Sequence, residues 1–364
     1  MKTYKHFIQL SAGIMAVLSL SVLPSSFVFA QEGASQLGGG IDQPNTNRAG
    51  TSGAAELLVP LTARYSALGG ATTSVLAGMN GLEALYANPA GLTNNQSTSA
   101  LFSRLQYVAD IGVNYFGLAQ RFGDNNLALT IAAWDMGELY RQTEANPEKS
   151  DDATFRVSFI NVGLTYARTL TDRISAGATI KVVNESIDDL TATGIIFDAG
   201  MTYVVGESGL RLGVALKNVG NELQFSGTGL GRQVQLPDQQ RDASVNTVQL
   251  ESEGVQYPTL LNFGVAYERS ITSNSSVTLL GNFRSNSFED DDFSGAVELG
   301  YGNLLYLRGG YEYSRENNVT FYKGYSFGAG LQFQVAGTDL AIDYSLLPTD
   351  YFDNIQFITA SVQL

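Results

Sequence analysis

The sequence predicts an all-β protein: a transmembrane antiparallel β-barrel of about 14 strands, with a short helical plug segment ahead of its first strand. Two observations carry this prediction. From Ser99 to Leu364 the chain divides into segments of strand length in which apolar and polar residues alternate. The connections between these segments are alternately short and long. Alternation alone also fits a soluble β-sandwich, but a sandwich has no reason to place its long loops at one end.

The two kinds of connection predict which rim faces which compartment. The short ones, expected to be periplasmic turns, are residues 122–126, 170–173, 206–209, 271–275, 302–303 and 336–338. The long polar ones, expected to be outer loops, are residues 135–153, 185–190, 221–255, 285–292, 314–323 and 347–353. The long outer loops are therefore the expected recognition surface of a barrel.

The first 55 residues predict an exported protein. Lys2 and Lys5 precede an apolar run and Val28-Phe29-Ala30, which is typical of a cleavable signal peptide over residues 1–30, cut after Ala30. A membrane-anchor helix is the alternative. Residues 31–55 are rich in Gly, Asn, Ser and Thr, so we expect them to form a flexible periplasmic leader.

Residues 56–98, the plug segment, lack the two-residue period of a strand and predict short helices. Its motif Asn88, Pro89, Ala90 and Gly91 predicts a helix stop, since proline does not continue a helix, and a movable hatch is the functional alternative. We expect this segment inside the barrel or across its periplasmic mouth, and the barrel itself over residues 99–364.

Each predicted strand has an apolar face for lipid and a small or polar face for the lumen. The lone Trp134 ends a strand just before a long loop, which favours an aromatic girdle position at the membrane surface over packing in a core. The alternation predicts that nine charged residues point into the lumen: Lys181, Asp198, Arg211, Lys217, Glu268, Glu298, Arg308, Glu312 and Asp343. They could pair with one another and with the plug segment, or line a path for a polar solute.

Composition argues against an enzyme. The only histidine, His6, lies in the predicted signal peptide, and the chain has no cysteine, so no nucleophile–imidazole pair and no imidazole or thiolate metal ligand is expected. We expect no cofactor and no metal. The run Glu289-Asp290-Asp291-Asp292 is better explained as a solvated outer loop than as a cation site. A net charge of −14 argues against a nucleic-acid partner.

Several motifs resemble the PorV/PorQ family of outer-membrane barrels, whose fold is similar to that of the FadL fatty acid transporters. They are residues 62–71 (TARYSALGGA), 86–92 (YANPAGL), 175–181 (SAGATIK), 210–220 (LRLGVALKNVG), 307–313 (LRGGYEY), 327–331 (FGAGL) and 341–345 (AIDYS). PorV proper tends to have an aspartate before the Ala-Arg pair and a lysine in its Asn-Pro segment. Thr62 and the motif at Asn88 depart from this, so the chain resembles the broader family.

The resemblance implies a non-enzymatic barrel in the outer membrane that binds and shuttles cargo in type IX protein secretion and surface attachment. The expected partners are outer-membrane lipid and secreted cargo or secretion-system proteins. The alternative is a FadL-like channel for hydrophobic small molecules, with a hydrophobic ligand or lipid in the lumen.

Overall fold

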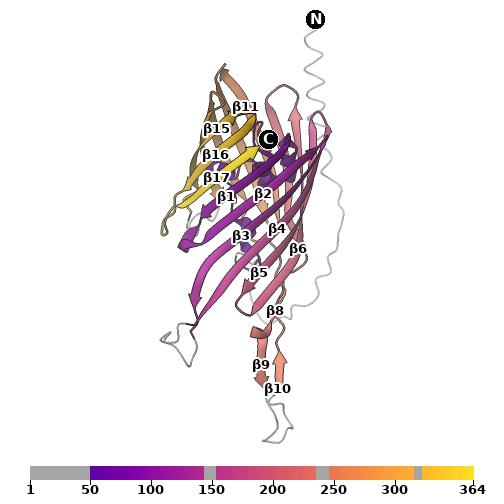
Figure 1. Cartoon of the computed structure of the whole chain (residues 1–364), viewed down its shortest axis with the longest axis vertical. Helices are drawn as coiled ribbons and strands as arrows, with labels where there is room; N and C mark the ends of the chain where they lie inside the picture. Colours follow the sequence, from indigo (N-terminus) through magenta and orange to yellow (C-terminus); the bar gives the residue numbers. More distant parts are fainter. Residues whose placement is uncertain (1–49, 143–152, 235–245, 315–321) are drawn as a thin grey trace, which may run out of the picture. The chain divides into compact units, whose positions relative to one another are not determined.

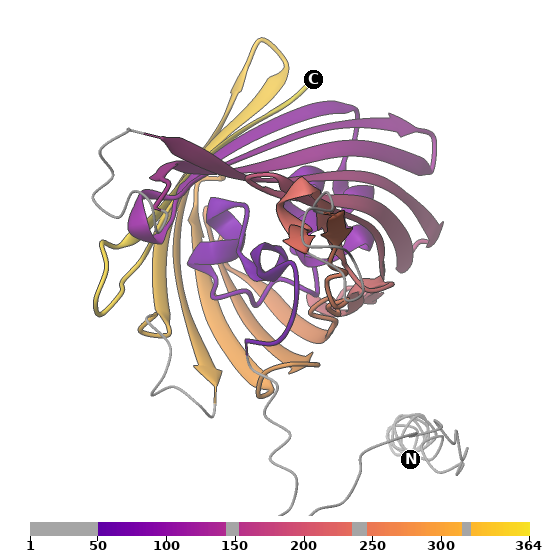
Figure 2. The same ribbon diagram turned by 90° about the horizontal axis from the view of Figure 1, so that it is seen from below.

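Fourteen strands form a closed antiparallel barrel in the computed structural model, which describes residues 50–142, 153–234, 246–314 and 322–364 (Figures 1 and 2). The predicted signal peptide and residues 31–49 of the predicted leader lie outside the described residues. Neighbours in sequence are neighbours in the barrel, except that β7 pairs with β11; β17 pairs with β1 and closes the ring. The predicted strand number and antiparallel order are confirmed.

The strands of the barrel wall are β1 Thr98–Gln106, β2 Gly112–Phe122, β3 Asn125–Tyr140, β4 Thr154–Thr171, β5 Ile174–Ile187, β6 Leu190–Val205, β7 Leu210–Gly220, β11 Leu260–Thr272, β12 Ser275–Asn286, β13 Asp292–Tyr301, β14 Leu305–Ser314, β15 Tyr325–Val335, β16 Thr338–Leu347 and β17 Ile355–Gln363. The connection between β7 and β11 contains β8 Phe225–Gly227, which pairs with β6, the 3-10 turn η4 Thr228–Leu230, and a hairpin of β9 Gly231–Val234 and β10 Asn246–Gln249. This hairpin extends from the long-loop rim, at the bottom of Figure 1.

Connection lengths alternate around the barrel as predicted, with one exception. The stretch 185–190 is not a long loop, because β5 continues to Ile187 and β6 begins at Leu190. Only Asp188 and Asp189 connect them, and Asp188 has a φ of 55°. The polar residues at the ends of β5 and β6 resemble a loop in the sequence, but in the structure their backbones remain paired up to Ile187 and Leu190.

The plug segment contains four short helical pieces: η1 Ala55–Leu58, α2 Ala63–Ala67, α3 Gly81–Ala87 and η2 Pro89–Asn94. Asn80 caps α3 through its side-chain oxygen, which accepts from the N–H of Leu82. Asn88 ends α3, and its side chain caps η2 by accepting from the N–H of Ala90. The helix stop predicted at Asn88-Pro89 is therefore confirmed. Among the described residues no helix is long and apolar enough to span a membrane, which says nothing of a β-barrel.

The plug segment lies inside the barrel, as the view along the barrel shows (Figure 2). Ala54 and Leu57 pack with Leu223 and Tyr257, which belong to the long connection between β7 and β11. The segment thus starts at the long-loop rim and reaches β1 at the short-turn rim.

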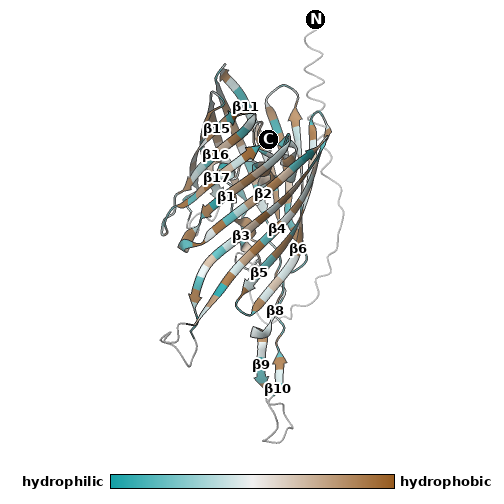
Figure 3. Ribbon diagram, in the orientation of Figure 1, coloured by the Kyte–Doolittle hydropathy of each residue, from teal (hydrophilic) through white to brown (hydrophobic). Residues whose placement is uncertain are grey.

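The wall strands keep the predicted alternation. On β7, Leu212, Val214 and Leu216 point outward and are exposed, while Ala215 and Lys217 are buried inside. The hydropathy of the residues alternates along the strands, as the colours of the ribbon show (Figure 3). These outward apolar side chains are the surface that lipid would cover.

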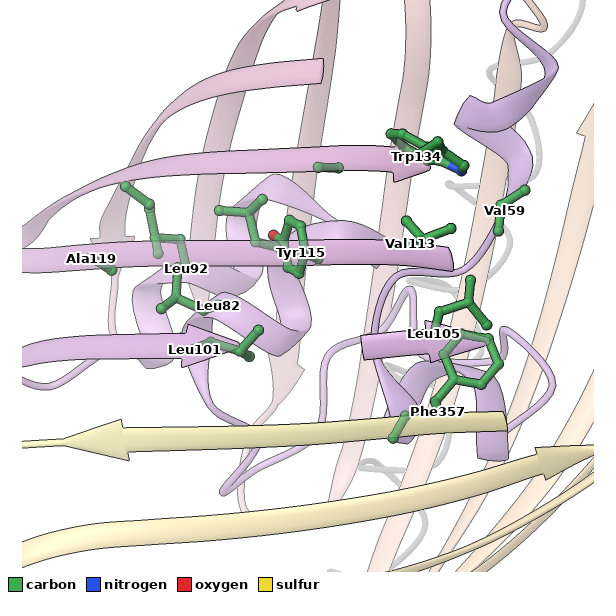
Figure 4. Close-up of a cluster of buried hydrophobic side chains, with 14 of the residues drawn as sticks. Val59, Leu82, Leu92, Leu101, Leu105, Val113, Tyr115, Ala119, Trp134 and Phe357 are labelled. Carbon is green, nitrogen blue, oxygen red and sulfur yellow. The ribbon is translucent and has the colours of Figure 1, made fainter. Parts of the chain in front are cut away.

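The predicted girdle position of Trp134 is wrong. Its side chain is 3% exposed and faces the lumen, on the same side of β3 as Ala128 and Ala132. It belongs to a cluster in which side chains of β1, β2, β3 and β17 point toward Val59, Leu82 and Leu92 of the plug segment (Figure 4). The strand period decides the direction, since Trp134 is an even number of residues from Ala132.

Candidate ligand site between the plug segment and the barrel wall

Inward-facing glycines let the plug segment approach the wall backbone closely. A Cβ at Gly213 would lie 2.0 Å from the carbonyl oxygen of Thr73, and one at Gly200 would lie 2.0 Å from Oδ1 of Asn88. Four other inward glycines have plug atoms within 2.6 Å of the same position: Gly177, Gly264, Gly310 and Gly328. Any larger residue at these positions would push the plug segment away from the wall.

The predicted plug motif ties the plug segment to β6 and β7. The side-chain amide of Asn88 is 2.9 Å from the carbonyl oxygen of Thr73 and 3.2 and 3.3 Å from those of Met201 and Val214, to which it donates. The other three motif residues, Pro89, Ala90 and Gly91, are buried. The sequence predicted the helix stop here and missed the tether. A hatch movement at this motif stays a proposal.

Three of the nine predicted lumen charges join a buried network with two plug residues. Arg64 of α2 donates to both carboxylate oxygens of Glu298, at 3.0 and 2.8 Å, and its guanidinium lies 3.8 Å from Glu83 of α3. Arg308 bridges Glu298 and Asp343. The network therefore links two plug helices to β13, β14 and β16.

The network is close to neutral at pH 7. Burial, and then the nearby carboxylate of Asp343, raise the pKa of Glu83 to about 8. With Glu83 protonated, the guanidinium groups of Arg64 and Arg308 balance the carboxylates of Glu298 and Asp343. Sequence reasoning missed Arg64 and Glu83, because a segment without a strand period does not reveal which side chains face the wall.

The remaining predicted charges also lie on the inner face. Lys181 forms an ion pair with Asp198 at 2.8 Å, and Glu312 pairs with Arg284, which also contacts Asp292. Arg284 was missed although its strand position, two residues from the buried Asn282, marks it as inward. Arg211 and Glu268 lie half-buried on the paired strands β7 and β11, near the short-turn rim.

A cavity of about 50 Å³ lies between the plug segment and strands β2 to β7. Most of its wall is apolar or aromatic: Leu57, Leu61, Leu85 and Tyr86 from the plug segment, and Tyr115, Ala132 and Trp134 from the barrel. The polar groups come from Glu56, Thr130, Asn161, Thr179, Lys181, Asp198 and Lys217. An apolar enclosure with a few converging polar groups is the usual form of a small-molecule site.

Lys217 is the lysine of this cavity that forms no ion pair with a described carboxylate. Its side chain is 4% exposed, and its ammonium lies 3.9 Å from the ring centre of Tyr86, a cation–π contact. Tyr86 is held in place by hydrogen bonds from its hydroxyl to the carbonyl oxygens of Leu57 and Val59. Within the described parts of the chain, no carboxylate comes within 4.0 Å of the Lys217 ammonium, because Asp198 pairs with Lys181.

The cavity is small in this conformation. Its volume of about 50 Å³ has room for only a few water molecules, since one water needs about 10–15 Å³ of such space. Benzene has been held in a protein cavity of roughly 150 Å³. An aromatic or acyl ligand therefore requires the plug side chains Leu57, Leu61 and Leu85 to move.

Comparison with known proteins supports the fold and no closer relationship. No protein-family profile and no curated protein sequence matches the chain. The toluene transporter TodX of Pseudomonas putida aligns with a TM-score of 0.52 and 14% identity over 82% of this chain and 96% of its own. The monoaromatic hydrocarbon channel CymD aligns with a TM-score of 0.51 and 13% identity over 84% and 97%. A Pseudomonas aeruginosa FadL homologue reaches 0.49 at 12% identity, over 84% and 98%.

The two matches with TM-scores above 0.5, TodX and CymD, share the barrel fold of this chain. They give no support to the resemblance to PorV and PorQ or to a role in type IX secretion.

Proposed function

We propose that this protein is an outer-membrane channel for hydrophobic small molecules, and that it prefers molecules with an anionic end. The cavity between the plug segment and the barrel wall carries the proposal. Its apolar wall suits a hydrocarbon or acyl chain, and the unpaired ammonium of Lys217 suits a carboxylate or a similar anion. The matched barrels with TM-scores above 0.5 are a hydrocarbon channel and a toluene transporter, which supports the class of solute.

An outer-membrane location follows from the same proposal. The outward apolar band requires a lipid environment, and the predicted signal peptide provides the route of export. The function proposed is transport, without catalysis and without a cofactor. Recognition of secreted proteins by the long loops, including the β9–β10 hairpin, is the competing proposal from the sequence, and no contact among the described residues favours it.

Uptake experiments separate the two proposals. Cells with an outer membrane that lack other channels of this type would express the wild type, the Lys217→Met variant, or a control with the exposed Lys323→Met. We expect the wild type and the control to take up a labelled dodecanoate several times faster than cells without the protein, and Lys217→Met to lose most of this gain. If uptake does not rise, while the long loops capture secretion components in a pull-down, then the channel proposal is wrong.

A further inference from the structure

Two buried carboxylates lie together at the long-loop rim without a cationic partner. Glu56 of η1 and Glu185 of β5 are both more than nine-tenths buried, and their neighbours Leu57 and Val183, the latter on the same face of β5 as Glu185, pack in one cluster. Among the described residues neither carboxylate has a Lys or Arg nitrogen within 4.0 Å. A buried pair of like charges is costly unless something neutralises it.

Other oxygen atoms around this pair lack partners as well. The side-chain amide nitrogen of Asn161 lies 3.4 Å from Oε1 of Glu56, which leaves the Asn161 Oδ1 without a hydrogen-bond partner among the described residues. Oε1 of Glu185 and the hydroxyl of Tyr257 also have no hydrogen-bond partner among the described residues. All three side chains are more than nine-tenths buried. The unsatisfied atoms are therefore oxygens, and they surround negative charge.

The fold brings these groups together from four parts of the chain. Glu56 comes from the plug segment, Asn161 from β4, Glu185 from β5 and Tyr257 from the connection before β11. The ring of Tyr257 extends over Gly194, where a Cβ would lie 1.7 Å from the tyrosine hydroxyl. Tyr257 packs in one buried cluster with Leu57, which is next to Glu56, and with Val183, which lies two residues before Glu185.

We propose that Glu56, Glu185 and Asn161 bind a calcium ion at this rim, with the Tyr257 hydroxyl beside it. Calcium takes six to eight oxygen ligands in flexible geometry, and carboxylates, amide oxygens and water are its usual ligands in proteins. No cluster of three or more Asp, Glu, His or Cys side chains suited to a metal occurs in the described residues. This site combines two carboxylates with neutral oxygens instead, and Glu56 and Asn161 also line the cavity, from which water can complete the coordination.

The ion would join the start of the plug segment to the barrel wall. Glu56 lies next to Leu57, which packs against Leu223 and Tyr257. A bound ion adds an electrostatic link to this apolar contact. The inference goes beyond the proposed transport function and does not depend on it, because it concerns only the anchoring of the plug segment.

A shared proton between the two carboxyl groups is the rival explanation, because burial and then Glu185 raise the pKa of Glu56 to about 7. A proton satisfies the carboxylate pair but leaves the oxygens of Asn161 and Tyr257 unpartnered. Calcium provides a partner for all of them. Binding of the metal alone separates the two explanations.

The test uses the full chain, purified in detergent with a chelator and then titrated at pH 8 with CaCl₂ or TbCl₃. We expect the unfolding midpoint to rise by several degrees in millimolar CaCl₂, and the rise to be lost in Glu185→Gln. We also expect terbium luminescence sensitised by Tyr257, which excess CaCl₂ abolishes and Tyr257→Phe strongly reduces. The matched control, Asp290→Asn at an exposed acidic residue of the connection between β12 and β13, should keep both signals.

Two results would overturn the proposal. One is a wild type that shows no calcium-dependent rise and no sensitised terbium signal. The other is a Glu185→Gln variant that is more stable than the wild type at pH 8 in the presence and absence of CaCl₂, since relief of carboxylate repulsion then explains the pair. The terbium signal of the wild type gives an answer even if a variant does not fold.

Discussion

Replacing Arg64 by methionine should loosen the plug segment without unfolding the barrel. Arg64 is 1% exposed, and its two hydrogen bonds to Glu298 are the charged connection between α2 and β13. Methionine has a similar length and no charge. After the substitution, Arg308 alone faces the carboxylates of Glu298 and Asp343, so the neutral network acquires one net negative charge.

The expected cost follows from that charge. Breaking a buried ion pair by removing one partner typically costs about 3–5 kcal/mol. Glu298 keeps its contact with Arg308, which favours the lower end, about 3 kcal/mol. At about 1.4 kcal/mol per tenfold change, local opening of α2 should become roughly 150 times more frequent. The barrel strands, whose backbone hydrogen bonds are unchanged, should open as rarely as before.

Amide hydrogen exchange of the detergent-solubilised protein measures this opening directly. We expect faster exchange in Ala63–Ala67 of Arg64→Met, with the strands β3 to β5 unaffected. The double variant with Glu298→Gln should recover most of the loss, because one guanidinium then faces one carboxylate. Two results would refute the role given to this network. One is an exchange rate in α2 that changes less than about twofold. The other is a double variant whose loss of stability in α2 equals the sum of the losses in the two single variants.

Three further substitutions test other parts of the structure. Because the pKa of Glu83 is raised from 4.5 to about 8, its contribution to folding is full below about pH 4.5 and is lost by about pH 8. The unfolding midpoint should therefore fall as pH rises from about 4.5 to about 8 and level off above that, and Glu83→Gln should remove this slope. Gly213→Ala should lower the free energy of unfolding by about 1–3 kcal/mol, because the new Cβ collides with Thr73 of the plug segment. It should also raise the conductance of single barrels in a planar bilayer. The outward Gly281→Ala, whose Cβ would lie 3.4 Å from its nearest neighbour, should change neither quantity. Lys217→Met should raise the unfolding midpoint, because the methionine removes a buried charge. In a fluorescence titration it should weaken dodecanoate binding at least tenfold. Binding of dodecanol should stay within about twofold, since the apolar wall is unaltered.

The strand pattern predicted the barrel well because one rule governs every strand. A two-residue period assigned the inward charges and the outward apolar residues, and alternating connections gave the two rims. The same rule, applied strictly, would have placed Trp134 inside, since Ala128 and Ala132 share its face. The girdle prediction relied on the residue type and ignored the period.

The plug segment was less predictable, for a physical reason. Its short helical pieces are held by the wall rather than by their own period, so Arg64 and Glu83 carried no signal that they meet Glu298 and Asp343. The tether from Asn88 to Met201 and Val214 joins residues more than a hundred positions apart. Such contacts depend on how the barrel closes, and a single sequence does not display them.

Fluorescence of the lone Trp134 tests the central claim most directly, because this side chain lines the cavity. Bromine quenches tryptophan only near contact, so a brominated dodecanoate reports a ligand at this wall. We predict saturable quenching by the brominated acid, displacement by unlabelled dodecanoate, and no displacement by a sugar. Quenching that is equal for free indole in the same detergent, or that never saturates, would contradict a hydrophobic ligand site between the plug segment and the barrel.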